Sequence, residues 1–184
     1  MTPIQAQGLP TILEGKDLLA QAKTGSGKTA TFAIGLLHKL EITTYQIQAM
    51  ILCPTRELAD QVTNEVRRLA RSIPNTKIVT LCGGKSMEPQ LASMEHQPHI
   101  IVGTPGRILK HLDRGSLKLD RLKILVLDEA DRMLDMGFHD EIMRVIKVTP
   151  HKRQTLLFSA TYPNKIKKIS NAIQINPIDI RVDS

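Results

Sequence analysis

The chain has 184 residues, of which 41% are apolar and 23% charged, and this balance is typical of one globular domain rather than a disordered chain. No apolar run approaches the roughly 18 residues of a membrane span, and the opening MTPIQAQGLP lacks the features of a signal peptide. We therefore expect a cytoplasmic protein without a membrane partner, and we also expect a monomer. The net charge of +7 fits either an anionic partner, with nucleic acid first, or solvated helix faces.

Seven short apolar runs follow one another along the chain and predict buried strands. They span 17–21, 48–53, 77–82, 99–103, 123–127, 154–158 and 178–182. Segments of helical periodicity lie between them, and one of these, 56–71, places apolar residues on a single helix face. Strands that alternate with helices predict the α/β class, with a mostly parallel sheet of about seven strands and helices on both faces. In such a sheet, ligands bind beyond the carboxyl ends of the strands.

A glycine-rich turn with the sequence AKTGSGKT, 22–29, follows the first predicted strand. Gly25 and Gly27 permit backbone angles that aim successive N–H groups into one concavity. The Lys28 ammonium can reach the β- and γ-phosphates of a nucleotide, and the Thr29 hydroxyl can bind Mg²⁺. The pattern predicts a Walker A loop, and the alternative is a Gly-Ser turn beside a chance lysine. The residues predicted to bind ATP here are Ala22, Lys23, Thr24, Gly25, Ser26, Gly27, Lys28 and Thr29.

Two motifs farther along the chain, PTRELA at 54–59 and TPGR at 104–107, each follow a predicted strand and open a helix. Such positions offer backbone N–H donors and an arginine guanidinium to a phosphate group. Taken alone, PTRELA also fits an ordinary helix that proline opens and threonine caps.

The cysteines and the aromatic residues argue against two kinds of site, a disulfide or metal site and a platform for stacked bases. Cys53 and Cys82 each end an apolar run, with no second ligand at metal spacing, so we expect two reduced core thiols. Two tyrosines, three phenylalanines and no tryptophan argue against a platform for stacked bases. Any nucleic-acid contact should therefore run through the sugar-phosphate backbone.

A stretch at 124–131, ILVLDEAD, places three carboxylates directly after a strand. Carboxylates that lie so close together repel one another, and they stay ionised only if a cation or water relieves the repulsion. Beside a Walker A loop, Asp128 is predicted to hold Mg²⁺, partly through water, and Glu129 to deprotonate the attacking water. Lys28, Asp128 and Glu129 form the predicted catalytic set, and the alternative for the carboxylates is a helix start favoured by the helix dipole.

Adenine is favoured as the nucleotide base. Guanine-specific P-loop proteins carry an Asn-Lys-x-Asp motif, and the segment NKIK at 164–167 lacks its aspartate. ATP and Mg²⁺ are thus the predicted cofactors. Farther along, SAT at 159–161 follows the strand 154–158, and its hydroxyls could hydrogen-bond Asp131, although a plain cap before the Pro163 helix is the alternative. The basic segment NKIKKIS is predicted to be a solvated helix face.

Taken together, these motifs resemble those of the DEAD-box RNA helicases. AKTGSGKT, PTRELA, a glycine pair, TPGR, the literal DEAD and SAT stand in the order of that family between residues 2 and 161. LCPTRELADQV, DEADRMLDMGF and RQTLLFSAT most resemble the bacterial DbpA type. The resemblance implies that 1–184 is the amino-terminal RecA-like domain of a P-loop helicase, whose second RecA-like domain is a partner in the intact protein.

The resemblance also implies roles for individual residues. Gln5, in TPIQ, is expected to read the adenine edge. One RNA strand is expected to be held through its phosphates and 2′-hydroxyls by Pro54, Thr55, Arg56, Gly83, Gly84, Thr104, Pro105, Gly106 and Arg107. Asp131, Ser159 and Thr161 are expected to couple the state of the nucleotide to the grip on RNA.

Three features of the family are not found in this sequence. They are the aromatic residue upstream of the Q motif, the second domain with its arginine-rich motif, and any carboxyl-terminal RNA-binding domain. An arginine finger contributes about 10³-fold or more to phosphoryl transfer. We therefore expect weak binding and negligible turnover from this chain, and RNA unwinding, with large-subunit ribosomal RNA as the implied target, only in the intact protein. The alternatives are an RNA-binding module that senses nucleotide without hydrolysis, and a DNA-directed or protein-translocating motor.

Overall fold

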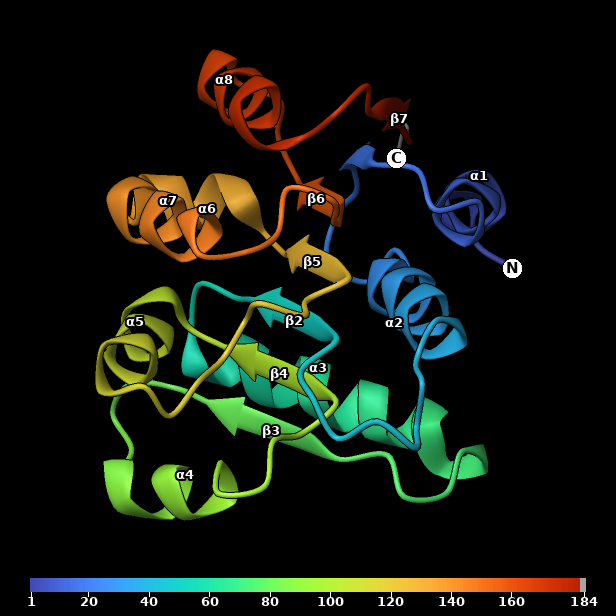
Figure 1. Ribbon diagram of the computed structural model, residues 1–184. Coiled ribbons are helices and arrows are strands. Elements are labelled where there is room, and N and C mark those ends of the chain that lie inside the picture. The colour runs from blue at the N-terminus through green and yellow to red at the C-terminus, as the bar shows by residue number, and fades with distance from the viewer. Residues whose placement is uncertain (183–184) are drawn as a thin grey trace.

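All seven predicted strands form one sheet in the computed structural model, which describes residues 1–182 (Figure 1). The strands are β1 (Leu18–Gln21), β2 (Ala49–Leu52), β3 (Ile78–Leu81), β4 (Ile100–Gly103), β5 (Ile124–Leu127), β6 (Gln154–Ser159) and β7 (Ile178–Arg181). Their order across the sheet is β3-β4-β2-β5-β6-β1-β7, and each neighbouring pair is parallel. The predicted fold class is thus confirmed, while positions 183–184 of the expected domain lie outside the described residues.

Helices cover both faces of this sheet. They are α1 (Pro3–Leu13), α2 (Lys28–His38), α3 (Arg56–Leu69), α4 (Met87–Ser93), α5 (Pro105–Arg114), α6 (Ala130–Asp135), α7 (His139–Lys147) and α8 (Asn164–Ile173), with a 3₁₀ turn at Ala70–Ser72. Figure 1 shows α1 and α2 on one side of the strands and α5 to α8 on the other, while α4 lies beside the edge strand β3. The layers are those of a doubly covered parallel sheet.

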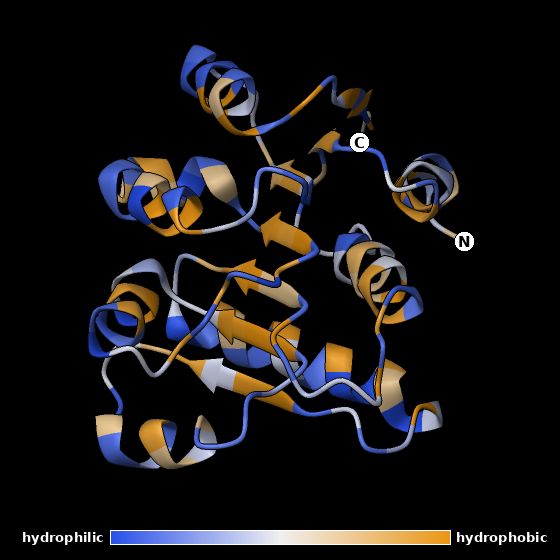
Figure 2. Ribbon diagram, in the orientation of Figure 1, coloured by the Kyte–Doolittle hydropathy of each residue, from blue (hydrophilic) through white to orange (hydrophobic). Residues whose placement is uncertain are grey.

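The central strands β2, β4 and β5 are apolar because they are buried on both faces, as their orange colour in Figure 2 shows, whereas the edge strand β7 has exposed charged residues. Successive residues of β2 point to opposite sides, so that Ile51 belongs to the same hydrophobic cluster as Phe32 and Val66, while Leu52 belongs to the cluster of Met133. Two separate hydrophobic clusters result, one on each face. Each fully buried aliphatic or phenylalanine side chain contributes roughly 1.5–3 kcal/mol, so the two clusters fix the positions of the strand ends.

The predicted helices form with small differences. In α3, the Thr55 hydroxyl accepts a hydrogen bond from the Leu58 N–H at 3.2 Å, and the helix ends at Leu69 before its 3₁₀ turn. The NKIKKIS segment was predicted to be a solvated helix face, and this is only half correct. Its lysines face outward, but Ile166 and Ile169 of α8 are buried against the sheet.

The thiols belong to the interior, as expected, and so do two of the five aromatic rings. Cys53 and Cys82 are buried and unpaired by disulfides, and burial raises the pKa of both thiols, that of Cys82 to about 11. Phe32 and Phe158 contact each other in the core with ring centroids 5.3 Å apart. Within residues 1–182, no helix combines the length and apolar character that crossing a membrane requires.

Candidate functional site

The sheet order brings the main motifs to one edge. The glycine-rich loop follows β1, DEAD follows β5, and SAT ends β6, which lies between those two strands. PTRELA, the glycine pair and TPGR follow β2, β3 and β4, which are neighbours on the other side of β5. Because all strands are parallel, all six motifs lie beyond their carboxyl ends, where ligands of such sheets bind.

The glycine-rich loop forms the wall of a cleft of about 300 Å³. Gly25 and Gly27 have backbone φ values of +83° and +86°, which residues with a side chain rarely adopt. Helix α2 then begins at Lys28. Thr29 and Glu129 also line this cleft. The geometry is that of an anion site, because the loop curves around the amino-terminal end of a helix.

Lys28 lies almost fully buried between the two carboxylates that follow β5. Its Nζ is 2.9 Å from Asp128 Oδ1 and 3.7 Å from Glu129 Oε2, and Asp128 is 0% exposed. Apart from this ion pair, Lys28 Nζ, both Asp128 oxygens and Ser26 Oγ are buried without another hydrogen-bond partner among residues 1–182. Buried polar groups are nearly always satisfied, so this cluster has unused capacity for a ligand.

Burial is the main influence on Asp128. It raises the pKa of this carboxyl above its usual value, the Lys28 ammonium opposes that rise, and the Glu129 carboxylate adds to it. A buried carboxylate that one lysine does not fully stabilise would gain from a second cation. Asp128 therefore fits the predicted place beside a metal ion.

Glu129 has a different geometry from its neighbour. Its backbone is left-handed, with φ 53° and ψ 52°, at the residue that precedes α6. This conformation is strained for a residue with a side chain, and such strain concentrates at functional sites. The turn directs Glu129 into the cleft, with Oε1 3.7 Å from Arg132 Nη1, while Asp128 remains buried below. The two adjacent carboxylates share Lys28 but differ in burial, and their separate roles stay a prediction.

Gln5 reaches the loop from α1. Thr2 and Gln5 form a reciprocal capping box, with Thr2 N–H donating to Gln5 Oε1 at 3.0 Å, and Gln5 Nε2 donates to the Gly27 carbonyl at 3.4 Å. Sequence analysis singled out Gln5 and missed Thr2, although the Thr-x-x-Gln spacing is itself a capping-box signal. The expected role of Gln5 in reading adenine stays a prediction.

PTRELA, the glycine pair and TPGR are in contact with one another. Gly83 N–H donates to Thr104 Oγ1 at 3.1 Å. A Cβ on Gly84, whose φ is +78°, would lie 3.2 Å from Arg56 Nη1. Arg56, Gly84 and Gly106 are exposed, so they can meet a ligand at this edge. The structure thus assembles one continuous surface from these three segments.

Arg107 departs from expectation. We expected TPGR to offer a free guanidinium to phosphate, but Arg107 is only 9% exposed. Its Nη1 donates to the Lys85 carbonyl at 2.8 Å and to Gln90 Oε1 at 3.2 Å. The expectation is therefore wrong for this geometry, because the side chain turns inward to hold the segment that follows the glycine pair.

The predicted coupling residues are only partly connected as expected. Asp131 Oδ2 accepts hydrogen bonds from Thr161, at 2.8 Å from Oγ1 and 3.2 Å from the backbone N. Ser159 does not contact Asp131, because its hydroxyl donates to the Thr161 carbonyl at 2.6 Å. The Ser159 carbonyl in turn accepts from Ala22 N–H at 2.9 Å. A chain of contacts therefore joins α6, the SAT segment and the start of the glycine-rich loop.

Comparison with known proteins agrees with this arrangement of motifs. The sequence profile of the DEAD/DEAH box helicases matches residues 2–169, which is most of the chain. The chain belongs to the DEAD/DEAH box helicase family.

Relatives of this helicase chain extend well beyond it. It is 60% identical to the ATP-dependent RNA helicase DbpA of Escherichia coli over 184 residues, which are 100% of this chain and 40% of that protein. It is 48% identical to the ATP-dependent RNA helicase CshA of Listeria monocytogenes, over 98% of this chain and 35% of that protein. The crystal structure of a DEAD box protein from Methanococcus jannaschii superposes with a TM-score of 0.94 at 41% identity, covering 99% of this chain and 50% of that one. The helicase chain thus spans half or less of these relatives.

Replacing Gly27 by alanine should damage both the fold and the nucleotide site of the helicase chain. Its φ is +86°, and a Cβ there would lie 2.7 Å from Gln5 Nε2 and 2.9 Å from Thr2 Oγ1. We expect a loss of unfolding free energy above the roughly 1–2 kcal/mol of left-handed strain, and weaker ATP binding. Urea denaturation and nucleotide titration measure the two effects. Gly25→Ala is the matched control, because its φ is +83° with nothing within 4 Å, so an equal loss there would contradict the predicted clash.

Proposed function

We propose that this chain is the ATP-binding half of an ATP-dependent RNA helicase. It binds Mg²⁺-ATP in the cleft of the glycine-rich loop and one RNA strand on the surface formed by PTRELA, the glycine pair and TPGR. A second RecA-like domain completes the ATP site in the intact protein. The observation that carries the proposal is the buried cluster of Lys28, Asp128 and Glu129, whose unused polar atoms face a phosphate-binding loop.

The residues of the cluster fit both predicted cofactors. Ser26 Oγ has no hydrogen-bond partner, and Lys28 Nζ contacts only the two carboxylates, so both can donate to phosphate oxygens. The Asp128 carboxylate, which only Lys28 contacts, can bind a metal ion or its water. Residues 1–182 contain no group of three His, Cys, Asp or Glu that could hold a metal alone. We infer that Thr29 and Asp128 hold Mg²⁺ together with phosphate oxygens, partly through water. Bound there, Mg²⁺ neutralises charge that develops on the phosphates.

Two residues act directly on the nucleotide in this proposal. Lys28 exchanges its contact with Asp128 for one with the β- and γ-phosphates, where a positive charge favours the transition state more than the ground state. Glu129, which faces the cleft, orients a water molecule and accepts its proton as the water attacks the γ-phosphate. Gln5 reads the adenine edge from its position beside Gly27.

RNA contact in this proposal runs along the backbone of one strand. Arg56 in the first turn of α3 and Gly106 in that of α5 are exposed, so these helix starts offer backbone N–H donors to phosphates, and Arg56 adds a charge. Recognition of the 2′-hydroxyl would separate RNA from DNA. The bond between Asp131 and Thr161 connects the ends of β5 and β6, which supports their proposed role in coupling nucleotide state to RNA grip.

The location, oligomeric state and RNA target proposed for the intact protein rest on its resemblance to the DbpA type. We infer a cytoplasmic monomer that acts, in its intact form, on large-subunit ribosomal RNA during ribosome assembly. The relatives are named as ATP-dependent RNA helicases, which supports the activity but not this target.

The test compares RNA and DNA strands of equal sequence as stimulators of ATP hydrolysis by protein that carries both helicase domains. We expect RNA to stimulate turnover and DNA to have little effect. Equal stimulation would contradict the RNA proposal in favour of a DNA-directed motor. Binding of RNA and ATP without any hydrolysis would favour an RNA-binding nucleotide sensor instead.

A further inference from the structure

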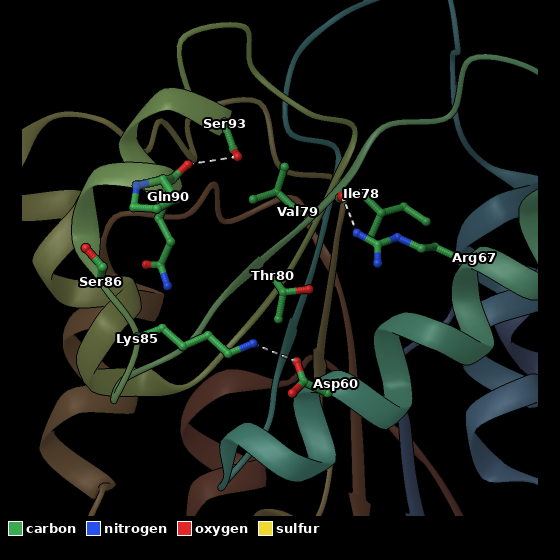
Figure 3. Close-up of a pocket in the computed structure, with 10 residues that line it drawn as sticks. Asp60, Arg67, Ile78, Val79, Thr80, Lys85, Ser86, Gln90 and Ser93 are labelled. Carbon is green, nitrogen blue, oxygen red and sulfur yellow. Dashed lines mark hydrogen bonds and ion pairs between the residues drawn. The ribbon is translucent and has the colours of Figure 1, made fainter.

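We propose that Gln90 is a positioning residue that holds the proposed RNA surface in shape. Gln90 is the one buried residue of the short helix α4, and it is 7% exposed. Figure 3 shows it extending from α4 towards Lys85, along a groove of about 410 Å³ beside the edge strand β3. The inference rests on the proposed function, because the segments that Gln90 joins are those assigned to RNA.

The amide of Gln90 uses both of its ends. Its Nε2 donates to the Cys82 carbonyl at 3.1 Å. Its Oε1 accepts from Arg107 Nη1 at 3.2 Å and lies 3.0 Å from His111 Nε2. Burial together with Arg107 and Arg114 lowers the pKa of His111 and favours the neutral ring. In the tautomer with its proton on Nε2, that ring donates to Gln90 as well.

These contacts hold the glycine pair from both sides. Gln90 binds the carbonyl of Cys82, directly before Gly83, and Arg107 binds the carbonyl of Lys85, directly after Gly84. The Lys85 side chain continues the connection to α3, with its Nζ 3.5 Å from Asp60 Oδ1, as Figure 3 shows. That exposed ion pair is weak by comparison with the buried amide contacts.

The glycine pair needs such support. A Cβ on Gly83 would meet nothing within 4 Å, and Gly84 has φ +78°, so neither residue is held in place by a side chain of its own. Glycine has the largest conformational freedom to lose when a ligand orders it. A loop that is already held before RNA binds loses less entropy on binding and so binds more tightly. Gln90 therefore acts on RNA affinity without touching RNA, and it also explains why Arg107 faces inward.

The test uses Gln90→Leu and Gln90→Glu in the whole chain, with Ser93→Ala as the matched control. Ser93 lines the same groove on the same helix, but its hydroxyl donates only to the Pro89 carbonyl. Leucine removes all three contacts, whereas glutamate retains the acceptor for Arg107 and His111 and loses the donor to Cys82. Single-stranded RNA binding is measured by fluorescence anisotropy at low salt, and ATP binding by titration of a fluorescent nucleotide.

We expect Gln90→Leu to weaken RNA binding about tenfold, equivalent to about 1.4 kcal/mol. Gln90→Glu should weaken it less, and ATP binding should stay within about twofold in both, since a factor of two is only about 0.4 kcal/mol. The backbone amide signals of Gly83 and Gly84 in nuclear magnetic resonance spectra should shift in Gln90→Glu and not in Ser93→Ala. If the Gln90→Leu variant does not fold, the RNA affinity and glycine signals of Gln90→Glu test the proposal on their own.

Three outcomes would overturn the inference. If Gln90→Glu binds RNA as tightly as wild type and the signals of Gly83 and Gly84 do not shift, the contacts of Gln90 have no effect on the RNA surface. An equal loss of ATP and RNA affinity would indicate a general structural role. A wild-type chain that binds ATP but no RNA would contradict the proposed function itself, and the inference would fall with it.

Discussion

Glu129→Gln should lower ATP turnover about 10²- to 10⁴-fold in protein that carries both helicase domains, the range for loss of a general base. Glutamine retains the shape and hydrogen bonding of the side chain but cannot accept the proton of the attacking water. Glu129 faces the cleft, whereas Asp128 lies buried below it beside Lys28, so we expect binding of Mg²⁺-ATP to be nearly unchanged. Steady-state hydrolysis and nucleotide titration separate the two effects.

The control for this prediction is Glu65→Gln. Glu65 lines the same cleft from α3, but its carboxylate pairs with Arg68 at 2.5 Å. It should therefore change turnover little. Hydrolysis that persists in Glu129→Gln, or that falls equally in Glu65→Gln, would mean that Glu129 is not the base.

Lys28→Met should cost both nucleotide binding and stability. Lys28 is 3% exposed, and its removal leaves Asp128 and Glu129 next to each other without their shared cation. Removing one partner of a buried ion pair typically costs about 3–5 kcal/mol of unfolding free energy. Chemical denaturation of the free chain measures that loss, and nucleotide titration should show that ATP no longer binds.

Two further measurements identify the cause of this loss. The double variant Lys28→Met/Asp128→Asn should recover much of the stability but none of the ATP binding, because it removes the unpaired charge. The folded-state pKa of Asp128 is already above its ordinary value of 3.8, so its contribution to stability is complete at low pH and declines as the pH rises through the folded pKa. Loss of Lys28 should raise that pKa further, so the destabilisation should grow with pH. A single variant as stable as wild type at neutral pH would refute the buried-pair interpretation.

Local sequence patterns were sufficient for most of the fold. Continuous apolar runs such as 124–127 occur where strands are covered on both faces, and all seven predicted strands are present with shifts of about one residue at their ends. The glycine-rich loop was predictable because Gly25 and Gly27 are required by their backbone angles. Parallel strands then imply that motifs at strand ends share one edge, which locates the site without knowledge of the strand order.

The parts that the sequence did not reveal depend on tertiary partners. Arg107 follows an apparent phosphate-binding motif, but the carbonyl of Lys85 and the amide of Gln90 turn it inward. The hydroxyl of Ser159 donates to the Thr161 carbonyl only two residues away, instead of to a carboxylate. The left-handed backbone conformation of Glu129 could not be predicted from its residue type, because glutamate rarely adopts this conformation. Each of these geometries is set by residues distant in the chain or by the turn itself.

The most direct test of the proposed function is steady-state ATP hydrolysis by this chain alone, with and without saturating single-stranded RNA, beside protein that also carries the second RecA-like domain. The Lys28, Asp128 and Glu129 cluster can bind and position Mg²⁺-ATP, but a transition-state arginine, worth about 10³-fold or more in rate, is expected from the other half. We predict that the chain binds nucleotide with negligible turnover and that RNA stimulates hydrolysis only when both halves are present. RNA-stimulated turnover by the chain alone, at a rate close to that of the two-domain protein, would contradict its assignment as half of an active site.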